Sequence, residues 1–357
     1  MKKKTLKSIA KEADVSPAMV SQILNGTGRA SDEVRNKILT LLEKYGYKPK
    51  YARYPFYYVV DLPQREITGK TQNVIENLSG VEGIFEDHDL TLHVDFLQSE
   101  PDLKRLKSII DRNPSGVFIN TDAPFLDEAC KLFHQADIPI VQVGYDTENP
   151  KYNAVVVDGF SGAYTATQYL LNKGHDRIGI IRFTAGNASI NSNKKFAGYS
   201  TALADHGLAV DKSLVKKMES TQGESGWEPI SNLVEELLGL SKPPTALFIE
   251  NSFVSLSVLY PFILEKSELS SAIQDLDIVV FEDWPMQPVN DIMSGKLFYP
   301  ELESVLVSID WENIGRQAAQ LLIKKVANNT AAPEILRVNP TLYQVKGNNR
   351  EPIIQKK

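Results

Sequence analysis

The chain is poor in the features that mark secreted and membrane proteins. It has one cysteine, Cys130, in 357 residues, so an internal disulfide framework is excluded. No run of apolar residues approaches the roughly 20 needed to span a bilayer. The lysine-rich N-terminus is not followed by the apolar stretch of a signal peptide. We therefore expect a cytoplasmic protein that does not bind membranes.

Catalytic patterns are also missing. The sequence has no glycine-rich phosphate loop, no Cys/His spacing of a metal site and no nucleophile elbow. Its five histidines are scattered, and His175 falls between a predicted helix and a predicted strand, where a structural hydrogen bond is expected. We expect no enzymatic activity, no catalytic residue, no metal and no cofactor.

What the chain does have is a strong asymmetry of charge. Residues 1–53 contain 12 Lys and Arg against 5 Asp and Glu, a net charge of +7. The whole chain carries −6, so residues 54–357 carry −13. A basic head on an acidic body is expected when only the head contacts phosphate groups. The length alone indicates two or three domains.

The head carries the pattern of a helix-turn-helix. Ile9, Ala10 and Ala13 form one apolar face of a first helix, and residues 14–16 make a tight turn. Ser31 starts a third helix that covers the other two. The apolar stripe of this third helix consists of Val34, Ile38, Leu41, Leu42 and Tyr45.

The second helix is the one expected to read DNA. Ser16 is a good N-cap and Pro17 suits the first helical position. The buried stripe consists of Val20, Ile23 and Leu24, and the outward-facing residues are Pro17, Ala18, Ser21 and Gln22. These lie near the helix N-terminus, where a recognition helix meets base edges. A helical bundle without a ligand would need the same stripes but not the basic charge.

After residue 55 the pattern changes to alternating strands and helices. Apolar strand-like runs lie at 56–62, 90–96, 116–120, 138–143, 153–157, 177–181, 245–250 and 278–281. Helical patterns lie at 72–87, 101–112, 125–135, 161–173, 193–206, 228–239 and 253–265. This alternation predicts an α/β fold with parallel sheets covered by helices. There are too many strands for one sheet, so we expect two lobes with a cleft between them.

Polar and aromatic residues follow several predicted strands. They include Asp61, Gln64, Arg65, Asp146, Asn251, Glu282 and Trp284. Ligands in such folds bind outside the carboxyl ends of the strands. Carboxylates and amides pair with hydroxyl groups and tryptophan covers the apolar face of a sugar ring, so a polyhydroxylated ligand is favoured. Each residue taken alone is also explained by helix capping or loop solvation.

Over essentially its whole length, the chain resembles the lactose-repressor (LacI/GalR) family of bacterial transcription regulators. Val20-Ser21-Gln22-Ile23-Leu24-Asn25 matches the family's Val-Ser-x-x-Leu-Asn, and residues 45–49 resemble its Gly-Tyr-x-Pro stretch. Residues 156–166, 171–179, 196–203 and 314–319 resemble four further family segments in the same order.

The resemblance implies a three-helix DNA-binding domain and a two-lobed core like a periplasmic sugar-binding protein. We place the first at 1–50, a short linker at 51–56 and the effector-binding and dimerisation core at 57–347. The N-lobe is assigned about 57–157 with 310–328, the C-lobe about 158–305 with 330–347, and a polar tail 348–357. The resemblance also implies a homodimer, a pseudo-palindromic DNA operator and a small-molecule effector that sets DNA affinity.

Site residues are carried over from the family by position. The residues implied at DNA are Thr5, Ser16, Pro17, Ala18, Ser21, Gln22, Asn25, Arg29, Tyr51 and Arg53. The residues implied at the effector are Asn191, Lys195, Trp227, Asn251, Glu282 and Trp311, beside the strand-end residues given above. Many members have an acid where this chain has Gly144, so Asp146 is expected to substitute for it.

Three departures from the family pattern carry information. Gln22 stands where an arginine is common, and glutamine prefers adenine to guanine, so the operator should differ there. Lys195 replaces a common arginine and Glu282 an aspartate, which changes the ligand contacts. In the linker, Pro55 lies about where the family's hinge helix carries a wedging leucine. Because proline disfavours helix at Tyr54, we predict no normal hinge helix.

An effector-responsive DNA-binding regulator is favoured over a sugar-binding transport protein and over an enzyme. The effector is expected to be a sugar because all three tryptophans fall near the predicted pocket. A purine, a sugar phosphate and a protein partner stay open. A sugar phosphate would need a second cation beside Lys195, which Arg65 or Arg182 could supply.

Overall fold

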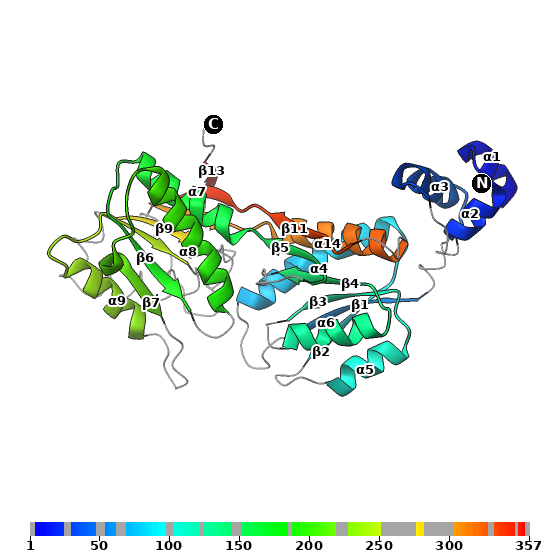
Figure 1. Cartoon of the computed structure of the whole chain (residues 1–357), viewed down its shortest axis with the longest axis horizontal. Coiled ribbons are helices and arrows are strands. Elements are labelled where there is room, and N and C mark those ends of the chain that lie inside the picture. Colours follow the sequence, from blue (N-terminus) through cyan, green and yellow to red (C-terminus); the bar gives the residue numbers. More distant parts are fainter. Residues whose placement is uncertain are drawn as a thin grey trace.

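Three bodies lie in a row: a helical head, an N-lobe and a C-lobe (Figure 1). The computed structural model describes residues 4–24, 30–47, 54–61, 69–97, 103–121, 125–144, 151–184, 188–218, 228–250, 276–281, 303–327, 332–346 and 349–353. The expected α/β fold with an N-terminal helical domain is confirmed. No helix in these ranges is long and apolar enough to cross a membrane.

The head consists of helices α1 (Leu6–Ala13), α2 (Pro17–Leu24) and α3 (Asp32–Lys44). Asp14 ends α1 with a φ of 60°, which produces the predicted tight turn. The Ser16 hydroxyl accepts a hydrogen bond from the backbone N of Met19 at 3.1 Å, as an N-cap does. The predicted stripes form one apolar core, with Val20 and Ile23 buried against Ile9 and Ile38. The helix-turn-helix prediction is therefore confirmed.

The N-lobe is a parallel sheet in the order β11-β5-β4-β3-β1-β2. Its strands are β1 (Phe56–Asp61), β2 (Leu92–Leu97), β3 (Gly116–Asn120), β4 (Ile140–Gly144), β5 (Asn153–Val157) and β11 (Ile335–Val338). Helices α4 (Gly69–Asp87) and α14 (Trp311–Ala327) pack on one face. Helices α5 (Leu103–Asp111) and α6 (Phe125–Gln135) pack on the other.

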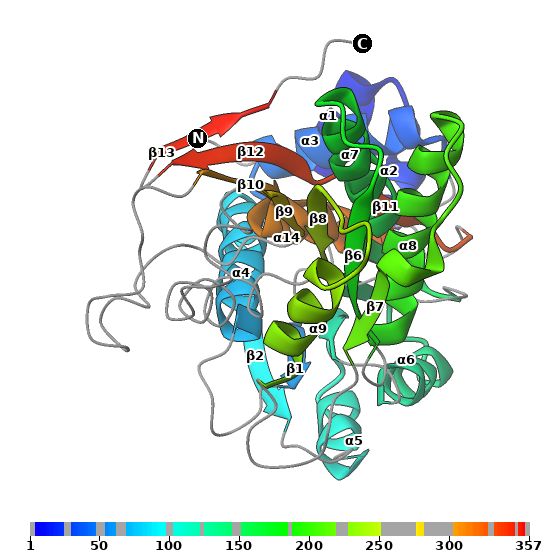
Figure 2. The same cartoon turned by 90° about the vertical axis from the view of Figure 1, so that its left-hand side faces the viewer.

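The C-lobe sheet has the order β13-β12-β10-β9-β8-β6-β7 (Figure 2). Its strands are β6 (Ile178–Phe183), β7 (Val215–Met218), β8 (Ala246–Ile249), β9 (Asp277–Phe281), β10 (Glu303–Ser308), β12 (Thr341–Lys346) and β13 (Asn349–Pro352). Only β12 runs antiparallel to β10 and β13 in this described sheet. Helices α7 (Gly159–Asn172) and α8 (Ala188–Asp205) cover one face, and α9 (Glu228–Leu238) covers the other.

Within the described ranges the chain passes between the lobes at three places. These are β5 to α7, β10 to α14, and β11 to β12. The first leaves the carboxyl end of the N-lobe sheet and the second leaves the carboxyl end of the C-lobe's parallel strands. The carboxyl edges of both sheets therefore lie at the junction, where ligands of α/β folds bind.

Two parts of the expected domain division are wrong. Residues 335–338 form β11, which pairs with β5 and so belongs to the N-lobe instead of the C-lobe. Residues 349–352 form β13, which pairs with β12, so this part of the expected polar tail is an edge strand of the C-lobe. Both pairings join segments whose partners cannot be read from local periodicity.

The eight predicted strand runs all lie on strands, whereas the predicted helix at 253–265 lies outside the described residues. Residues 51–53, the first half of the predicted linker, also lie outside them, so the predicted absence of a hinge helix stays a prediction. Its last residues are extended: the carbonyls of Tyr54 and Pro55 accept hydrogen bonds from Ser115 at 2.8 and 3.0 Å. Residues 54 and 55 are not helical and lead directly into β1.

Candidate DNA-binding face and ligand site

The outward face of α2 is open to solvent. Ser16, Pro17, Ala18 and Gln22 are exposed and Ser21 is half-buried, while the opposite side of the helix is buried in the head core. The exposed Thr5 caps α1, accepting a hydrogen bond from the backbone N of Ser8 at 3.3 Å. Four further predicted DNA contacts lie outside the described residues: Asn25, Arg29, Tyr51 and Arg53.

One acid of the head is neutralised internally. Glu12 accepts hydrogen bonds from Lys4 Nζ at 2.8 Å and from the Tyr45 hydroxyl at 2.9 Å. Those two hydrogen bonds hold the pKa of the Glu12 carboxyl below its usual value. The Lys4 ammonium also lies 4.4 Å from the centre of the Tyr45 ring. The carboxylate is thereby tied to a lysine of the head and opposes the approach of phosphate less.

Two buried cations and one buried carboxylate gather at the carboxyl edge of the C-lobe sheet. Lys195 on α8 is 5% exposed, Arg182 on β6 is 6% exposed and Glu250, directly after β8, is 2% exposed. Lys195 Nζ donates to the carbonyl of Glu250 at 2.9 Å and lies 4.0 Å from the ring centre of Phe281, the last residue of β9. Residues from three adjacent strands and one helix thus meet at the lobe junction.

Arg182 is fixed by several contacts. Its Nε and Nη2 donate to the Ser192 hydroxyl at 3.2 and 3.1 Å, and Nη2 donates to Asn193 Oδ1 at 2.9 Å. The guanidinium stacks 4.3 Å from the ring centre of Phe196, and Nε lies 3.6 Å from Glu250 Oε1. A buried arginine held in this way is pre-organised for planar recognition of polar groups.

The N-lobe contributes polar groups from the facing edge. Asn120, at the end of β3, donates from Nδ2 to the Tyr58 hydroxyl at 2.8 Å. Burial raises the pKa of the Tyr58 hydroxyl well above its usual value, so this group stays neutral. Gly144, at the end of β4, has a φ of 118°, which residues with a side chain rarely adopt. The backbone therefore requires glycine where the family resemblance led us to look for an acid.

The remaining predicted effector residues divide into two groups. Asp61 ends β1, Asn191 is half-buried on α8 beside Lys195, and Trp311 is buried at the first position of α14. These placements are at the lobe junction. The other predicted residues lie outside the described ranges: Gln64, Arg65, Asp146, Trp227, Asn251, Glu282 and Trp284.

Sequence reasoning noted Glu250 after a predicted strand but assigned only its neighbour Asn251 to the site, and it named Arg182 only as a second cation for one class of ligand. A sequence signal for both residues exists, because Glu250 and Arg182 are charged residues at the ends of otherwise apolar strand patterns. What the sequence did not reveal is that α8 brings Lys195 to the same place.

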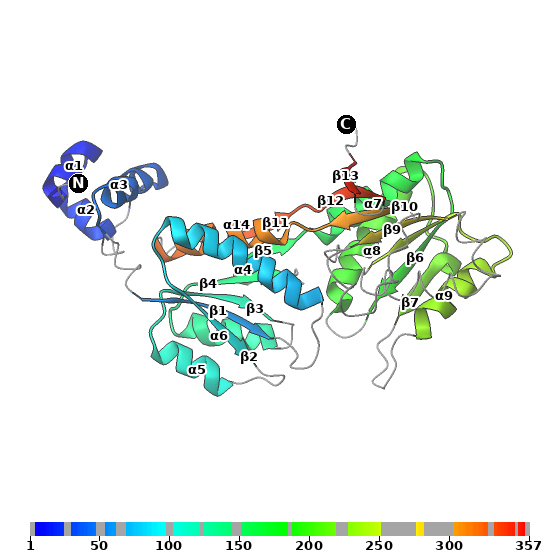
Figure 3. The same ribbon diagram turned by 180° about the vertical axis from the view of Figure 1, so that it is seen from behind.

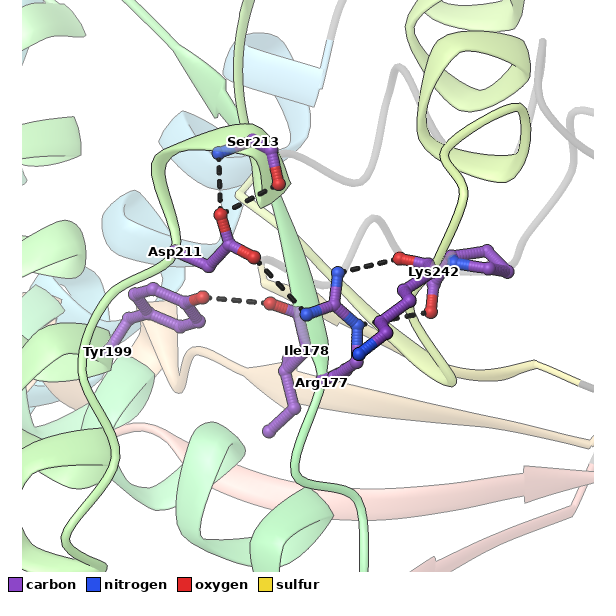
Figure 4. Close-up of polar contacts among 7 residues, drawn as sticks. Arg177, Ile178, Tyr199, Asp211, Ser213 and Lys242 are labelled. Carbon is purple, nitrogen blue, oxygen red and sulfur yellow. Dashed lines mark hydrogen bonds and ion pairs between the residues drawn. The ribbon is translucent and has the colours of Figure 1, made fainter.

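A second polar cluster lies at the opposite, amino edge of the C-lobe sheet (Figure 4). Arg177 donates to Asp211 at 3.2 Å and to the Lys242 carbonyl at 2.6 Å, while the Tyr199 hydroxyl donates to the Ile178 carbonyl at 2.8 Å. These bonds satisfy loop carbonyls and tie neighbouring segments together, which is a structural role.

His175 belongs to the same edge and makes the structural contacts that its position predicts. Its Nε2 lies 2.6 Å from Asp277 and its Nδ1 lies 3.0 Å from the Thr245 hydroxyl. Burial raises the pKa of Asp277, but hydrogen bonds from Lys173 and His175 outweigh it and leave the pKa below its usual value. Among the described residues no group of three or more His, Cys, Asp or Glu could hold a metal ion.

Family models match both parts of the chain. Residues 5–50 match the bacterial regulatory proteins of the lacI family, and residues 77–346 match the periplasmic binding proteins and sugar binding domain of the LacI family. The chain belongs to the LacI family. The LacI-family assignment confirms the resemblance found in the sequence.

Named relatives and solved structures are similar along nearly the whole chain. The transcriptional repressor PurR of Mannheimia succiniciproducens is 24% identical over 95% of this chain and 96% of its own length. Catabolite control protein A of Priestia megaterium is 25% identical over 94% of this chain and 96% of its own. A transcriptional regulator CelR in complex with cellobiose matches 97% of this chain and 100% of its own, with a TM-score of 0.61 and 20% identity. The lac repressor dimer bound to operator and an anti-inducer matches 96% of this chain and 98% of its own, with a TM-score of 0.58 and 16% identity.

Proposed function

We propose that this LacI-family protein is a cytoplasmic transcriptional repressor without enzymatic activity. It binds a pseudo-palindromic DNA operator as a homodimer, and a sugar bound between the two lobes modulates its affinity for that operator. The observation that carries the proposal is the combination of an exposed, N-capped recognition helix on a basic head with a two-lobed core. In that core, buried polar groups meet at the carboxyl edges of both sheets.

The DNA side of the proposal rests on α2. Its exposed residues Pro17, Ala18 and Gln22 read base edges in the major groove. The proposed phosphate contacts are Thr5, Ser16, Ser21, Asn25 and Arg29, with Tyr51 and Arg53 at the linker. The head's charge of +7 attracts DNA of any sequence, and the α2 side chains discriminate between sequences.

The ligand side rests on the junction of the lobes. Lys195, Asn191 and Trp311 lie there, and Arg182 and Glu250 join them. The proposal places Asp61, Gln64, Arg65, Asp146, Trp227, Asn251, Glu282 and Trp284 around the same ligand. Carboxylates and amides pair with hydroxyl groups, and tryptophan rings cover the apolar face of a sugar. The CelR structure that this chain resembles was solved with cellobiose, which supports a sugar.

A sugar phosphate is a second candidate that one observation favours. Lys195 and Arg182 both contact Glu250, so the second cation that a phosphate needs lies beside the first. Glu250 offsets one of the two charges. We therefore keep neutral sugars as the first candidate.

The proposed dimer has a candidate face on the N-lobe. Ile75 on α4 is 53% exposed, and Val94 and Phe96 on the edge strand β2 are 36% and 51% exposed. Large apolar side chains exposed together are typical of interfaces. The solved lac repressor, a dimer bound to operator, shares the fold of this chain.

A thermal-shift screen of the full-length protein tests the ligand. The panel contains neutral sugars, sugar phosphates, sugar acids and nucleobases. A ligand at 100 times its Kd adds about 2.7 kcal/mol of stability, which is visible as a raised Tm. A neutral sugar that raises Tm in the wild type but not in Lys195→Ala supports the proposal. A purine as the sole hit, or no hit in the panel, contradicts the sugar assignment.

A further inference from the structure

The head is held against the core by a buried contact. Arg35 on α3 is 5% exposed, and its Nη1 donates to the carbonyl of Ala327 at 2.5 Å. Ala327 is the last residue of α14, 292 positions further along the chain. Figure 3 shows the head beside this end of α14. The contact therefore joins the DNA-binding domain to the N-lobe independently of the linker.

The C-terminal end of α14 is suited to receive a cation. The last four carbonyls of a helix have no partner within the helix, and together they form the negative end of its dipole. The Arg35 guanidinium satisfies one of these carbonyls with a charged donor. A charged hydrogen bond that is buried is less screened by salt than one in solvent.

The same end of α14 is tied to the segment that enters β11. Lys324 and Lys325 lie 3.1 and 2.9 Å from Glu334, and Lys325 Nζ donates to the Ala332 carbonyl at 2.7 Å. Glu334 directly precedes β11, and its backbone N donates to Asn153 at the start of β5. Arg35 thus docks where α14 and the entry to β11 meet.

The opposite end of α14 lies at the lobe junction. The helix begins at the buried Trp311, directly after the passage from β10 in the C-lobe. With a rise of about 1.5 Å per residue, it carries a displacement of its first turn over roughly 24 Å to Ala327. The Arg35 contact is therefore linked to two of the three passages between the lobes. The passage from β10 ends on α14, which Arg35 contacts directly. The passage to β12 begins on β11, whose entry is tied to the end of α14.

Helix α4 packs closely against α14. A Cβ at Gly80 would lie 2.0 Å from the Glu312 carbonyl, and one at Gly315 would lie 2.0 Å from the Asn77 carbonyl. The two backbones are therefore in direct contact, so we expect α14 to move together with α4 instead of bending locally. The outward face of α2 stays exposed while Arg35 is docked, so the contact is compatible with DNA binding.

We propose that Arg35 is a positioning residue that couples the head to the arrangement of the lobes through α14. A change at the junction moves the end of α14 and with it the orientation of the head. By reciprocity, DNA bound to the head must alter the junction. This route does not need a hinge helix, which the linker sequence does not predict. The inference rests on the proposed function.

Hydrogen exchange on the full-length protein tests the coupling without a known effector. An operator duplex is first selected from random DNA with the wild type. Exchange of backbone amides in residues 308–316, at the start of α14, is then compared with and without that duplex. The variants are Arg35→Ala, Arg35→Lys and Lys37→Ala. Lys37 is exposed on the same helix, so its removal controls for the loss of one positive charge.

The expected result separates coupling from binding. DNA should change exchange at the junction by about fivefold or more in the wild type and in Lys37→Ala, within the usual range of allosteric coupling. In Arg35→Ala this change should disappear even at DNA concentrations that saturate the variant, and Arg35→Lys should restore part of it. An unchanged response in Arg35→Ala, or no response in the wild type, overturns the inference. Failure to select any duplex would instead contradict the proposed function.

Discussion

At the scale of single residues, we expect Gln22 to set the preferred base at one operator position. Its side chain lies exposed on α2, one turn beyond Pro17 and Ala18. Replacing Gln22 by Ala should cost about 1–3 kcal/mol at one operator position and little on random DNA. Binding of selected and scrambled duplexes, measured by anisotropy, checks this expectation. Asn36→Ala, an exposed change on α3, is the control. An equal loss on both duplexes would show that Gln22 contacts phosphate instead.

We expect Asp277 to make the stability of the C-lobe depend on pH. Its pKa is lowered in the folded protein because Lys173 and His175 hydrogen-bond the carboxylate and outweigh its burial. A carboxyl whose pKa is lower in the folded state stabilises the fold at any pH above its pKa in the unfolded chain, about 3.9. This stabilisation is lost as the pH falls through the pKa of the folded state.

We therefore expect Asp277→Asn to be less stable than the wild type at pH 7. The difference should shrink as the pH falls below about 4, because the wild-type carboxyl then becomes protonated. Urea midpoints measured between pH 7 and pH 3 check both statements. A difference that stays constant down to pH 3 would mean that the charge of Asp277 contributes nothing.

Features formed by neighbouring residues could be predicted from the sequence, whereas contacts between residues far apart in the chain could not. The Ser16 cap, the Asp14 turn and the stripe of α2 follow from neighbouring residues, and all are found. The meeting of Arg182 with Glu250 depends on the pairing of β6 with β8, whose residues are separated by more than 60 positions. Periodicity contains no information about that pairing.

At the scale of elements, α4 and α14 pack so closely that their backbones touch. Gly80→Ala would place a Cβ 2.0 Å from a backbone carbonyl that cannot rotate away. Overpacking typically costs about 1–3 kcal/mol and here acts against a helix-propensity gain of about 1 kcal/mol. We expect a net loss of stability, measured by urea unfolding. Gly83→Ala, where the nearest atom is the end of the Arg316 side chain at 4.0 Å, should be neutral or stabilising. Equal effects of the two changes would show that the helices separate freely.

Strands were predicted best where both neighbours in the sheet are buried. The central strands β3, β4, β8 and β9 are mostly apolar and agree with the predicted ranges to within two residues at each end. The edge strand β13 reads Asn349-Arg350-Glu351-Pro352, which has no apolar pattern. It is a strand because its backbone pairs with β12. Side-chain periodicity does not reveal such a pairing, so the sequence predicted a polar tail here.

At the scale of the whole molecule, the apolar face of the N-lobe should hold two protomers together. Phe96→Glu places a charge on a side chain that is 51% exposed in the single chain. We expect the dimer to dissociate because burying that charge at an interface is costly, whereas the fold of the protomer should be kept. Sedimentation velocity measures the change. Phe160→Glu, at a 39% exposed site on α7 in the C-lobe, is the control and should stay dimeric. A dimeric Phe96→Glu protein would place the interface elsewhere.

The proposed regulation requires that the ligand site and the DNA-binding face act on each other. The most direct test measures the Kd of the full-length protein for its selected operator, with and without the ligand found by thermal shift. Saturating ligand should change this Kd by about 5–150-fold, the usual range for allosteric coupling. A ligand that raises Tm but leaves the operator Kd unchanged would contradict the proposed regulation.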